Sequence, residues 1–153
     1  MADTASIAAA VDTWVTQHHD EIIEWRRHLH SHPELSNEEV QTTRFIHDVL
    51  VAHGLQPVPF PGTGLYVDIG PEGGERLAFR ADIDALKVTE QTGLSFASTE
   101  PGVSHACGHD VHTTVALALA CALAKAPLPN GVRVIFQPAE EVMGGGALDV
   151  IKW

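Results

Sequence analysis

One short segment gathers most of the side chains that could bind a metal ion. Residues 105–112 read His-Ala-Cys-Gly-His-Asp-Val-His, which places one thiol, three imidazoles and one carboxylate close together. Thiolate and imidazole are good ligands for zinc and similar divalent ions, and Gly108 permits a tight backbone between Cys107 and His109. The alternative is a helix N-terminus with incidental polar residues, in which Cys107 is only a small buried side chain. The density of ligand types favours a metal site.

Two acidic segments could complete such a site. Glu140 and Glu141 end the segment Phe-Gln-Pro-Ala-Glu-Glu, and Asp82 and Asp84 lie in Arg-Ala-Asp-Ile-Asp-Ala-Leu. Of two adjacent carboxylates, one can bind a metal while the other stays free as a general base. The simpler explanations are a solvated acidic loop for the first pair and a strand end with a capping Asp for the second.

A strand–helix–strand unit should bring these segments together. Residues 77–81 and 132–136 are short, β-rich runs bounded by Gly or Pro, and residues 109–126 form an Ala- and Leu-rich helical stretch. Strands joined in this way are parallel, with a right-handed crossover. Ligands of open α/β sheets bind at the carboxyl ends of the strands. The topology therefore predicts that all three segments converge on one rim of the sheet.

The remaining elements follow from hydrophobic spacing. We predict helix from about residue 5 to residue 31, in two pieces, because apolar side chains recur at helical spacing and Pro33 should end the stretch near His32. Ser36 and Glu39 have the spacing of a capping box, which predicts a second helix that ends near His53. The pattern further predicts a strand over 65–69, a long loop over 85–108 and the start of a helix over 147–153.

Composition limits the class of protein. The 153 residues include 9 basic and 20 acidic side chains, giving a net charge of −11, and 44% are hydrophobic. This suits a single globular domain over residues 1–153. The acidic balance argues against nucleic-acid partners and against anionic membrane surfaces. The apolar run 115–124 is too short to cross a membrane.

Cysteine usage and the first residues indicate the compartment. Two cysteines, Cys107 and Cys121, do not make a disulfide framework, and Cys121 is expected to be an inert thiol buried in a helix. Residues 1–6 carry no basic side chain, so we expect no secretory signal. These features predict a cytoplasmic protein with reduced thiols.

Taken together, these segments resemble the M20 metallopeptidase family. The resemblance is to its amidohydrolase branch, the N-acyl-amino-acid, hippurate and auxin-conjugate hydrolases, and it covers nearly the whole chain from Trp25 onward. Residues 25–35, Trp-Arg-Arg-His-Leu-His-Ser-His-Pro-Glu-Leu, are similar to the opening signature of that branch. The resemblance implies an α/β fold, the N-terminal part of a zinc-exopeptidase-like catalytic domain, with a parallel-rich sheet flanked by helices.

The resemblance also implies a role for each matching residue. Cys107, His109 and Glu141 match metal ligands, in a site that holds two divalent ions, which could be zinc, manganese, cobalt or nickel. Glu140 matches the general base that takes a proton from the metal-activated water. The implied reaction is hydrolysis of the amide bond of N-acyl amino acids or similar conjugates, a small-molecule substrate class.

Two further residues are expected to support the ligands. Asp84 matches a signature Asp of the family and would orient a ligating His, as carboxylates near metal sites commonly do. His112 lies three positions after His109 and could do the same, or could be a packed structural His. His28 and His32 are spaced to share a helix face, but the resemblance gives them no metal role.

Length is the main departure from the family. Chains of this family continue past the position of Trp153 and supply further His ligands, the rest of the sheet and a smaller domain used for pairing. We therefore expect residues 1–153 to be the N-terminal portion of a homodimeric parent enzyme, with little activity alone. The alternative function is that of a truncated, catalytically inert fragment with weak or no metal binding.

Overall fold

The computed structural model describes residues 3–153. The helices are α1 (Thr4–Gln17), α2 (His19–Ser31), α3 (Val40–Ala52), α4 (His109–Leu123) and α5 (Ala147–Lys152). The strands are β1 (Val58–Pro59), β2 (Leu65–Ile69), β3 (Arg76–Asp82) and β4 (Gly131–Gln137). The predicted helices and strands are therefore present within a few residues of their expected bounds, including the break that divides the first helical stretch. The two-residue strand β1 was not expected.

The sheet is mixed, with the strand order β1-β2-β4-β3. Strand β3 pairs with β4 in parallel, so the predicted strand–helix–strand unit is confirmed. Strand β2 pairs with β4 antiparallel, and β1 pairs with β2 antiparallel. The α/β class is correct, but the expectation of a parallel-rich sheet is wrong for the described residues. The short link 70–75 reverses the chain between β2 and β3, and β4 then lies between them, parallel to one and antiparallel to the other.

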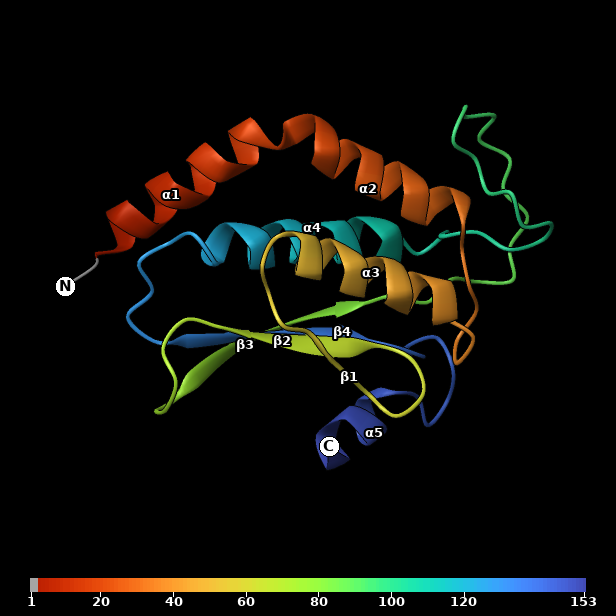
Figure 1. Cartoon of the computed structure of the whole chain (residues 1–153). Helices are drawn as coiled ribbons and strands as arrows, with labels where there is room; N and C mark the ends of the chain where they lie inside the picture. Colours follow the sequence, from red (N-terminus) through yellow and green to blue (C-terminus); the bar gives the residue numbers. More distant parts are fainter. Residues whose placement is uncertain (1–2) are drawn as a thin grey trace.

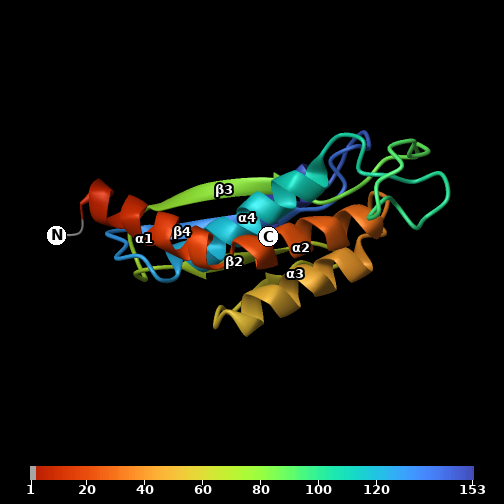
Figure 2. The ribbon, with the colours of Figure 1, turned by 90° about the horizontal axis from the view of Figure 1, so that it is seen from above.

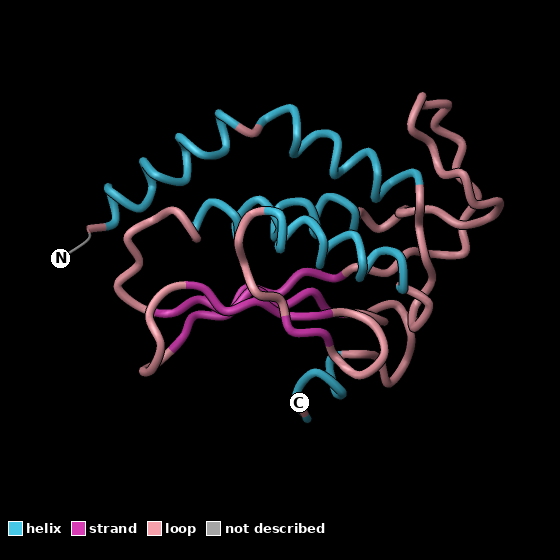
Figure 3. Tube along the Cα trace, in the orientation of Figure 1, coloured by secondary structure: helices cyan, strands magenta, loops and turns pink. Residues whose placement is uncertain are grey.

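The helices form layers on one face of the sheet. Helix α4 lies next to the strands, α1 and α2 cover it from outside, and α3 packs against α4 (Figure 1; Figure 2). The short helix α5 lies on the opposite side of the sheet (Figure 3). The loop 85–108 projects beyond the end of α2 and returns to the start of α4 (Figure 1). None of the helices within residues 3–153 is long and apolar enough to cross a membrane.

Helix α4 is the central element of the core. Its small side chains allow close packing against both the sheet and the outer helices, and Ala116, Leu117, Ala120 and Cys121 are all 0% exposed. Burial raises the pKa of Cys121 to about 12, so this thiol stays protonated, in agreement with the expectation of a buried thiol. The apolar body of α4 thus holds its polar first turn in a fixed place.

The start of α3 differs from the predicted capping box. The carboxylate of Glu34 accepts hydrogen bonds from the backbone N–H groups of Gln41 and Thr42, at 3.1 and 2.8 Å, and so caps the helix. Glu39 makes no capping hydrogen bond with its side chain, and the Ser36 hydroxyl donates to Asp84 instead. The spacing was correct for a capping box, but both side chains have partners elsewhere in the fold.

We expect Leu117→Ala to lower the free energy of unfolding by about 2–5 kcal/mol, because it leaves a cavity in the hydrophobic core. The matched control is Val115→Ala on the same helix, where the side chain is 51% exposed and the change should be within about 0.5 kcal/mol. Urea unfolding of the three proteins measures both values. Similar losses in both variants would contradict the assignment of α4 as the core helix.

Candidate metal centre

Three potential metal ligands converge at one end of the sheet. One ligand atom each of Cys107, His109 and Glu141 lies within 4.8 Å of the other two. His109 is the first residue of α4, Cys107 immediately precedes that helix, and Glu141 follows the carboxyl end of β4. The predicted convergence of these segments on one rim is therefore confirmed.

Gly108 makes the close approach of Cys107 and His109 possible. It is the N-cap residue of α4 and has a φ of +91°, a left-handed conformation that favours glycine. Its carbonyl accepts the backbone N–H groups of Val111 and His112, at 3.1 and 3.2 Å, which starts the helix directly after the turn. The thiol and the imidazole are thereby presented on the same side of the chain.

Asp84 connects two of the three potential ligands. The Nδ1 atom of His109 lies 2.8 Å from the Asp84 carbonyl oxygen and 3.3 Å from its Oδ1. The Asp84 Oδ2 atom accepts hydrogen bonds from the Ser36 hydroxyl at 2.7 Å and from the Glu141 backbone N–H at 3.0 Å. With Nδ1 engaged, Nε2 of His109 is the nitrogen that faces Glu141, at 3.9 Å from Oε1. Asp84 therefore lies where it can orient the His109 ring through Nδ1.

The electrostatics of the group depend on this contact. Burial disfavours the charged imidazole of His109, but hydrogen bonds to Asp84 and its charge outweigh burial and raise the pKa of His109 to about 9. Burial likewise disfavours the Asp84 anion, but hydrogen bonds from His109, Glu141 and Ser36 lower the pKa of Asp84 to about 2. A hydrogen bond to Glu141, together with burial and nearby carboxylates, raises the pKa of the Cys107 thiol. Without a metal ion, the site therefore holds protons that a divalent cation would displace.

The donor set fits a divalent cation. Within residues 3–153, the buried Glu141 Oε1 atom has no hydrogen-bond partner, and Asp84 Oδ1 has only the longer 3.3 Å contact with His109 Nδ1. A buried carboxylate oxygen without a partner is costly, and a cation at this place would satisfy it. The mixture of thiol, imidazole and carboxylate suits zinc and related ions. Glu140, the neighbour of Glu141, is exposed, so its carboxylate can reach solvent beside the group.

The model of a protein family described as "Peptidase family M20/M25/M40" matches residues 78–153. This range includes Asp84, Cys107, His109, Glu140 and Glu141. The crystal structure of the Bacillus subtilis YXEP protein, described as a dinuclear metal binding peptidase from the M20 family, superposes with a TM-score of 0.83 and 44% identity over 90% of this chain and 40% of that one. The chain belongs to peptidase family M20.

Curated relatives of this M20 chain are longer proteins. N-acetyl-L-cysteine deacetylase of Bacillus subtilis (strain 168) is 48% identical over 136 residues, which are 86% of this chain and 32% of the relative. A Rhodococcus jostii (strain RHA1) protein named "Putative glutamate--cysteine ligase 2-3" is 55% identical over 150 residues, 97% of this chain and 19% of that protein. The chain thus spans a fifth to a third of their length, and most of the ligase-named protein lies outside the match.

His112 contacts Asp82 rather than a ligand of the M20 centre. Its Nδ1 atom accepts the Asp82 backbone N–H at 3.2 Å and lies 3.5 Å from the Asp82 carboxylate. Its ring is 6.4 Å from that of His109, measured between centroids. His112 therefore supports the end of β3, and an orienting role on a metal ligand stays a prediction without a direct contact.

A buried polar network lies beside the centre and was not predicted from the sequence. Asp110 is 1% exposed, and its Oδ2 atom lies 2.7 Å from His30 Nδ1 and 3.0 Å from Arg26 Nε. The other ring nitrogen of His30 is 3.1 Å from Glu90, which belongs to the long loop. The network ties this loop to α2 and α4. The four-residue spacing of Arg26 and His30 within residues 25–35 was the only sequence signal for it.

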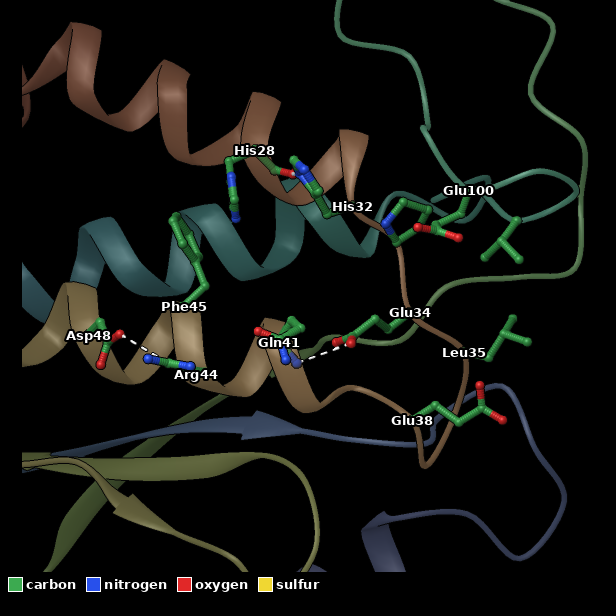
Figure 4. A pocket seen from close by; sticks show the side chains of 12 residues that line it. His28, His32, Glu34, Leu35, Glu38, Gln41, Arg44, Phe45, Asp48 and Glu100 are labelled. Carbon is green, nitrogen blue, oxygen red and sulfur yellow. Dashed lines mark hydrogen bonds and ion pairs between the residues drawn. The ribbon is translucent and has the colours of Figure 1, made fainter.

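A cavity of about 530 Å³ lies at the end of α2 and the start of α3, apart from the metal ligands (Figure 4). His28 stacks on Phe45 and on His32, at 4.3 and 4.5 Å between ring centroids, so His28 and His32 do share a helix face. Burial and the neighbouring His32 lower the pKa of His28. The remaining lining residues are Pro33, Glu34, Leu35, Glu38, Gln41, Arg44, Asp48, Glu100 and Val103.

We expect the metal-free chain to lose stability as the pH rises from about 6.5 to about 9. The pKa of His109 is raised from 6.5 to about 9 in the folded protein, so its stabilising charge is fully present below pH 6.5 and is lost as the pH rises through 9. The lowered pKa of Asp84 affects stability only in acid, because its stabilising contribution is lost as the pH falls from 3.8 through about 2. Urea unfolding of chelator-treated protein across this range measures the slope.

The control for this slope is Asp84→Asn, which keeps the shape but removes the charge that holds the proton on His109. Its loss of stability between pH 6.5 and 9 should be smaller, and the His109 midpoint followed by NMR should move toward 6.5. An unchanged midpoint in the variant would rule out Asp84 as the cause of the raised pKa.

Proposed function

We propose that Cys107, His109 and Glu141 are ligands of a two-ion metal centre, and that this centre hydrolyses the amide bond of N-acyl amino acids. The observation that carries the proposal is the convergence of three ligand atoms within 4.8 Å, beside an exposed second carboxylate, Glu140. The name of the deacetylase relative supports the substrate class. Zinc, manganese, cobalt and nickel all suit these ligands.

The side chains of this chain would divide the work. When bound, divalent ions would polarise the substrate carbonyl and make water more acidic. Glu140 would take the proton of the attacking water and deliver it to the departing amine. Asp84 would hold His109 with Nε2 toward the centre, and Cys107 would bind as the thiolate after losing its proton. The products would be a carboxylic acid and a free amino acid.

Compartment and assembly are parts of the same proposal. Cys107 and Cys121 are both free thiols, and a thiol that must bind metal is preserved in a reducing compartment, so we place the protein in the cytoplasm. The homodimer implied by the resemblance stays a prediction.

We expect Glu140→Gln to lower kcat for N-acetylated amino acids by about 10²–10⁴, because it removes the general base and leaves the ligands intact. The assay follows release of the free amine from N-acetyl-L-cysteine and other N-acetyl amino acids with each of the four metals. Glu100→Gln, which changes an exposed carboxylate at the separate cavity, is the control and should have wild-type activity.

The outcome of this assay decides between the two functions. Full activity in Glu140→Gln would disprove the role of this residue as base. Absent hydrolysis together with little bound metal in the unmodified chain would favour the inert alternative for residues 1–153.

We expect Cys107→Ser to remove the near-ultraviolet thiolate-to-metal charge-transfer band that forms on adding Co²⁺, because the sulfur ligand is lost. Cys121→Ala is the matched control, since its thiol is buried in α4 and cannot reach the centre. The band and the bound cobalt are measured by absorption titration and by elemental analysis after dialysis. A band that survives in Cys107→Ser but disappears in Cys121→Ala would reverse the assignment.

A further inference from the structure

Glu39 is a buried carboxylate for which only a capping-box role at the start of α3 was predicted. It is 0% exposed and directly precedes α3. Its Oε1 atom accepts the backbone N–H of Ala139 at 2.7 Å, and its Oε2 atom accepts the Thr63 hydroxyl at 2.7 Å. No Lys, Arg or His within residues 3–153 forms an ion pair with it. A carboxylate buried without a cation depends on such donors, so these two contacts are strongly favoured.

The backbone that Glu39 holds is in an uncommon conformation. Ala139 has a φ of +54°, in the left-handed region that residues other than glycine rarely adopt. Its carbonyl accepts the backbone N–H of Gly146 at 3.0 Å. Glu39 and Gly146 therefore tie the N–H and the carbonyl of the residue that comes immediately before Glu140.

The glycines of the same turn show how closely its backbone packs. A Cβ atom on Gly145 would lie 2.0 Å from the Ala139 carbonyl oxygen, and one on Gly146 would lie 2.0 Å from the Pro138 carbonyl oxygen. Both positions therefore require glycine. The loop that carries Glu140 and Glu141 is thus closed at its base by backbone contact and held from outside by Glu39.

The segment before α3 contacts the metal centre at a second point. Ser36 donates to Asp84 Oδ2, the same atom that accepts the Glu141 backbone N–H. Glu34 and Glu38 of this segment line the separate cavity (Figure 4), whereas Ser36 and Glu39 contact the rim. The segment therefore holds the Glu140–Glu141 pair from both ends, through Ala139 and through Asp84.

We propose that Glu39 is a positioning residue that locks Ala139 in its left-handed conformation and thereby sets where Glu140 and Glu141 stand. This inference rests on the proposed function of that pair. Glu39 does not touch substrate or metal. It acts through one backbone N–H, and its effect is on metal affinity and on the direction of the Glu140 carboxylate.

Four variants separate positioning from simple stabilisation. Glu39→Gln keeps an oxygen toward Ala139 and can donate its amide to Thr63, whereas Glu39→Ala loses both contacts. Thr63→Ala removes only the other partner of the carboxylate and is the matched control. Ala139→Gly, combined with Glu39→Ala, makes the left-handed conformation easy to adopt without the carboxylate.

The first measurement is amide hydrogen exchange by NMR on the metal-free chain. We expect the Ala139 amide to be protected in the unmodified protein and in Glu39→Gln, and to exchange at least about tenfold faster in Glu39→Ala, as loss of one charge-assisted hydrogen bond implies. An Ala139 amide that is unprotected from the start, or equally protected in Glu39→Ala, would overturn the proposal whether or not metal binds.

The second measurement is Co²⁺ affinity through the Cys107 charge-transfer band. We expect Glu39→Ala to weaken binding by about 10–100-fold, and Glu39→Gln and Thr63→Ala to stay within about threefold. Adding Ala139→Gly should restore part of the affinity. A lower melting temperature in Glu39→Ala with unchanged cobalt affinity would reduce Glu39 to a structural residue and refute the inference. If the unmodified chain shows no Cys107-dependent band, the proposed metal centre is disproved. The exchange rate of the Ala139 amide is then the test of whether Glu39 positions the loop.

Discussion

The arrangement of the rim depends on one buried carboxylate. Asp84 is 1% exposed, yet it accepts hydrogen bonds from Ser36 and from the Glu141 backbone and contacts His109. Leaving water costs an ionised carboxylate several kcal/mol unless donors replace the lost hydration. Those donors come from the segment before α3, the loop after β4 and the first turn of α4. Stabilising this anion therefore requires three distant parts of the chain to be in place, which is also what assembling the ligands requires.

The architecture explains why such an arrangement can be rigid. Strands β3 and β4 are parallel and adjacent, so the segments that follow them leave the sheet at the same edge. Helix α4 crosses between them with most of its apolar body buried and its polar first turn at that edge. The body of the helix is fixed by packing, and the N-terminal residues are fixed by Gly108 and Asp84. Metal ligands placed on such elements vary less in position than ligands on a free loop.

Sequence reasoning predicted the elements and the convergence because both follow from local or topological rules. Periodicity located the helices, and the strand–helix–strand rule brought Asp84, His109 and Glu141 to one rim. The sequence alone could not predict that β2 lies antiparallel beside β4. Strand order within a sheet depends on tertiary packing, and hydrophobic spacing does not determine it. The contacts of Ser36 and Glu39 were missed for a similar reason, since their partners are 48 and 100 residues away in the sequence.

The failure of the predicted capping box shows which interactions prevail when local and distant partners compete. A cap at an exposed helix start contributes about 1 kcal/mol, since water can satisfy the same N–H groups. A carboxylate or a backbone N–H at a buried rim has no water to replace a lost partner, and an unmet group there costs about 1–3 kcal/mol or more when charged. Glu34 can cap α3 from the edge of an open cavity, which frees Glu39 for the buried N–H of Ala139. A polar motif that fits a local rule but lies beside a buried rim is therefore expected to bond to distant donors instead. Such departures from local rules concentrate at functional sites.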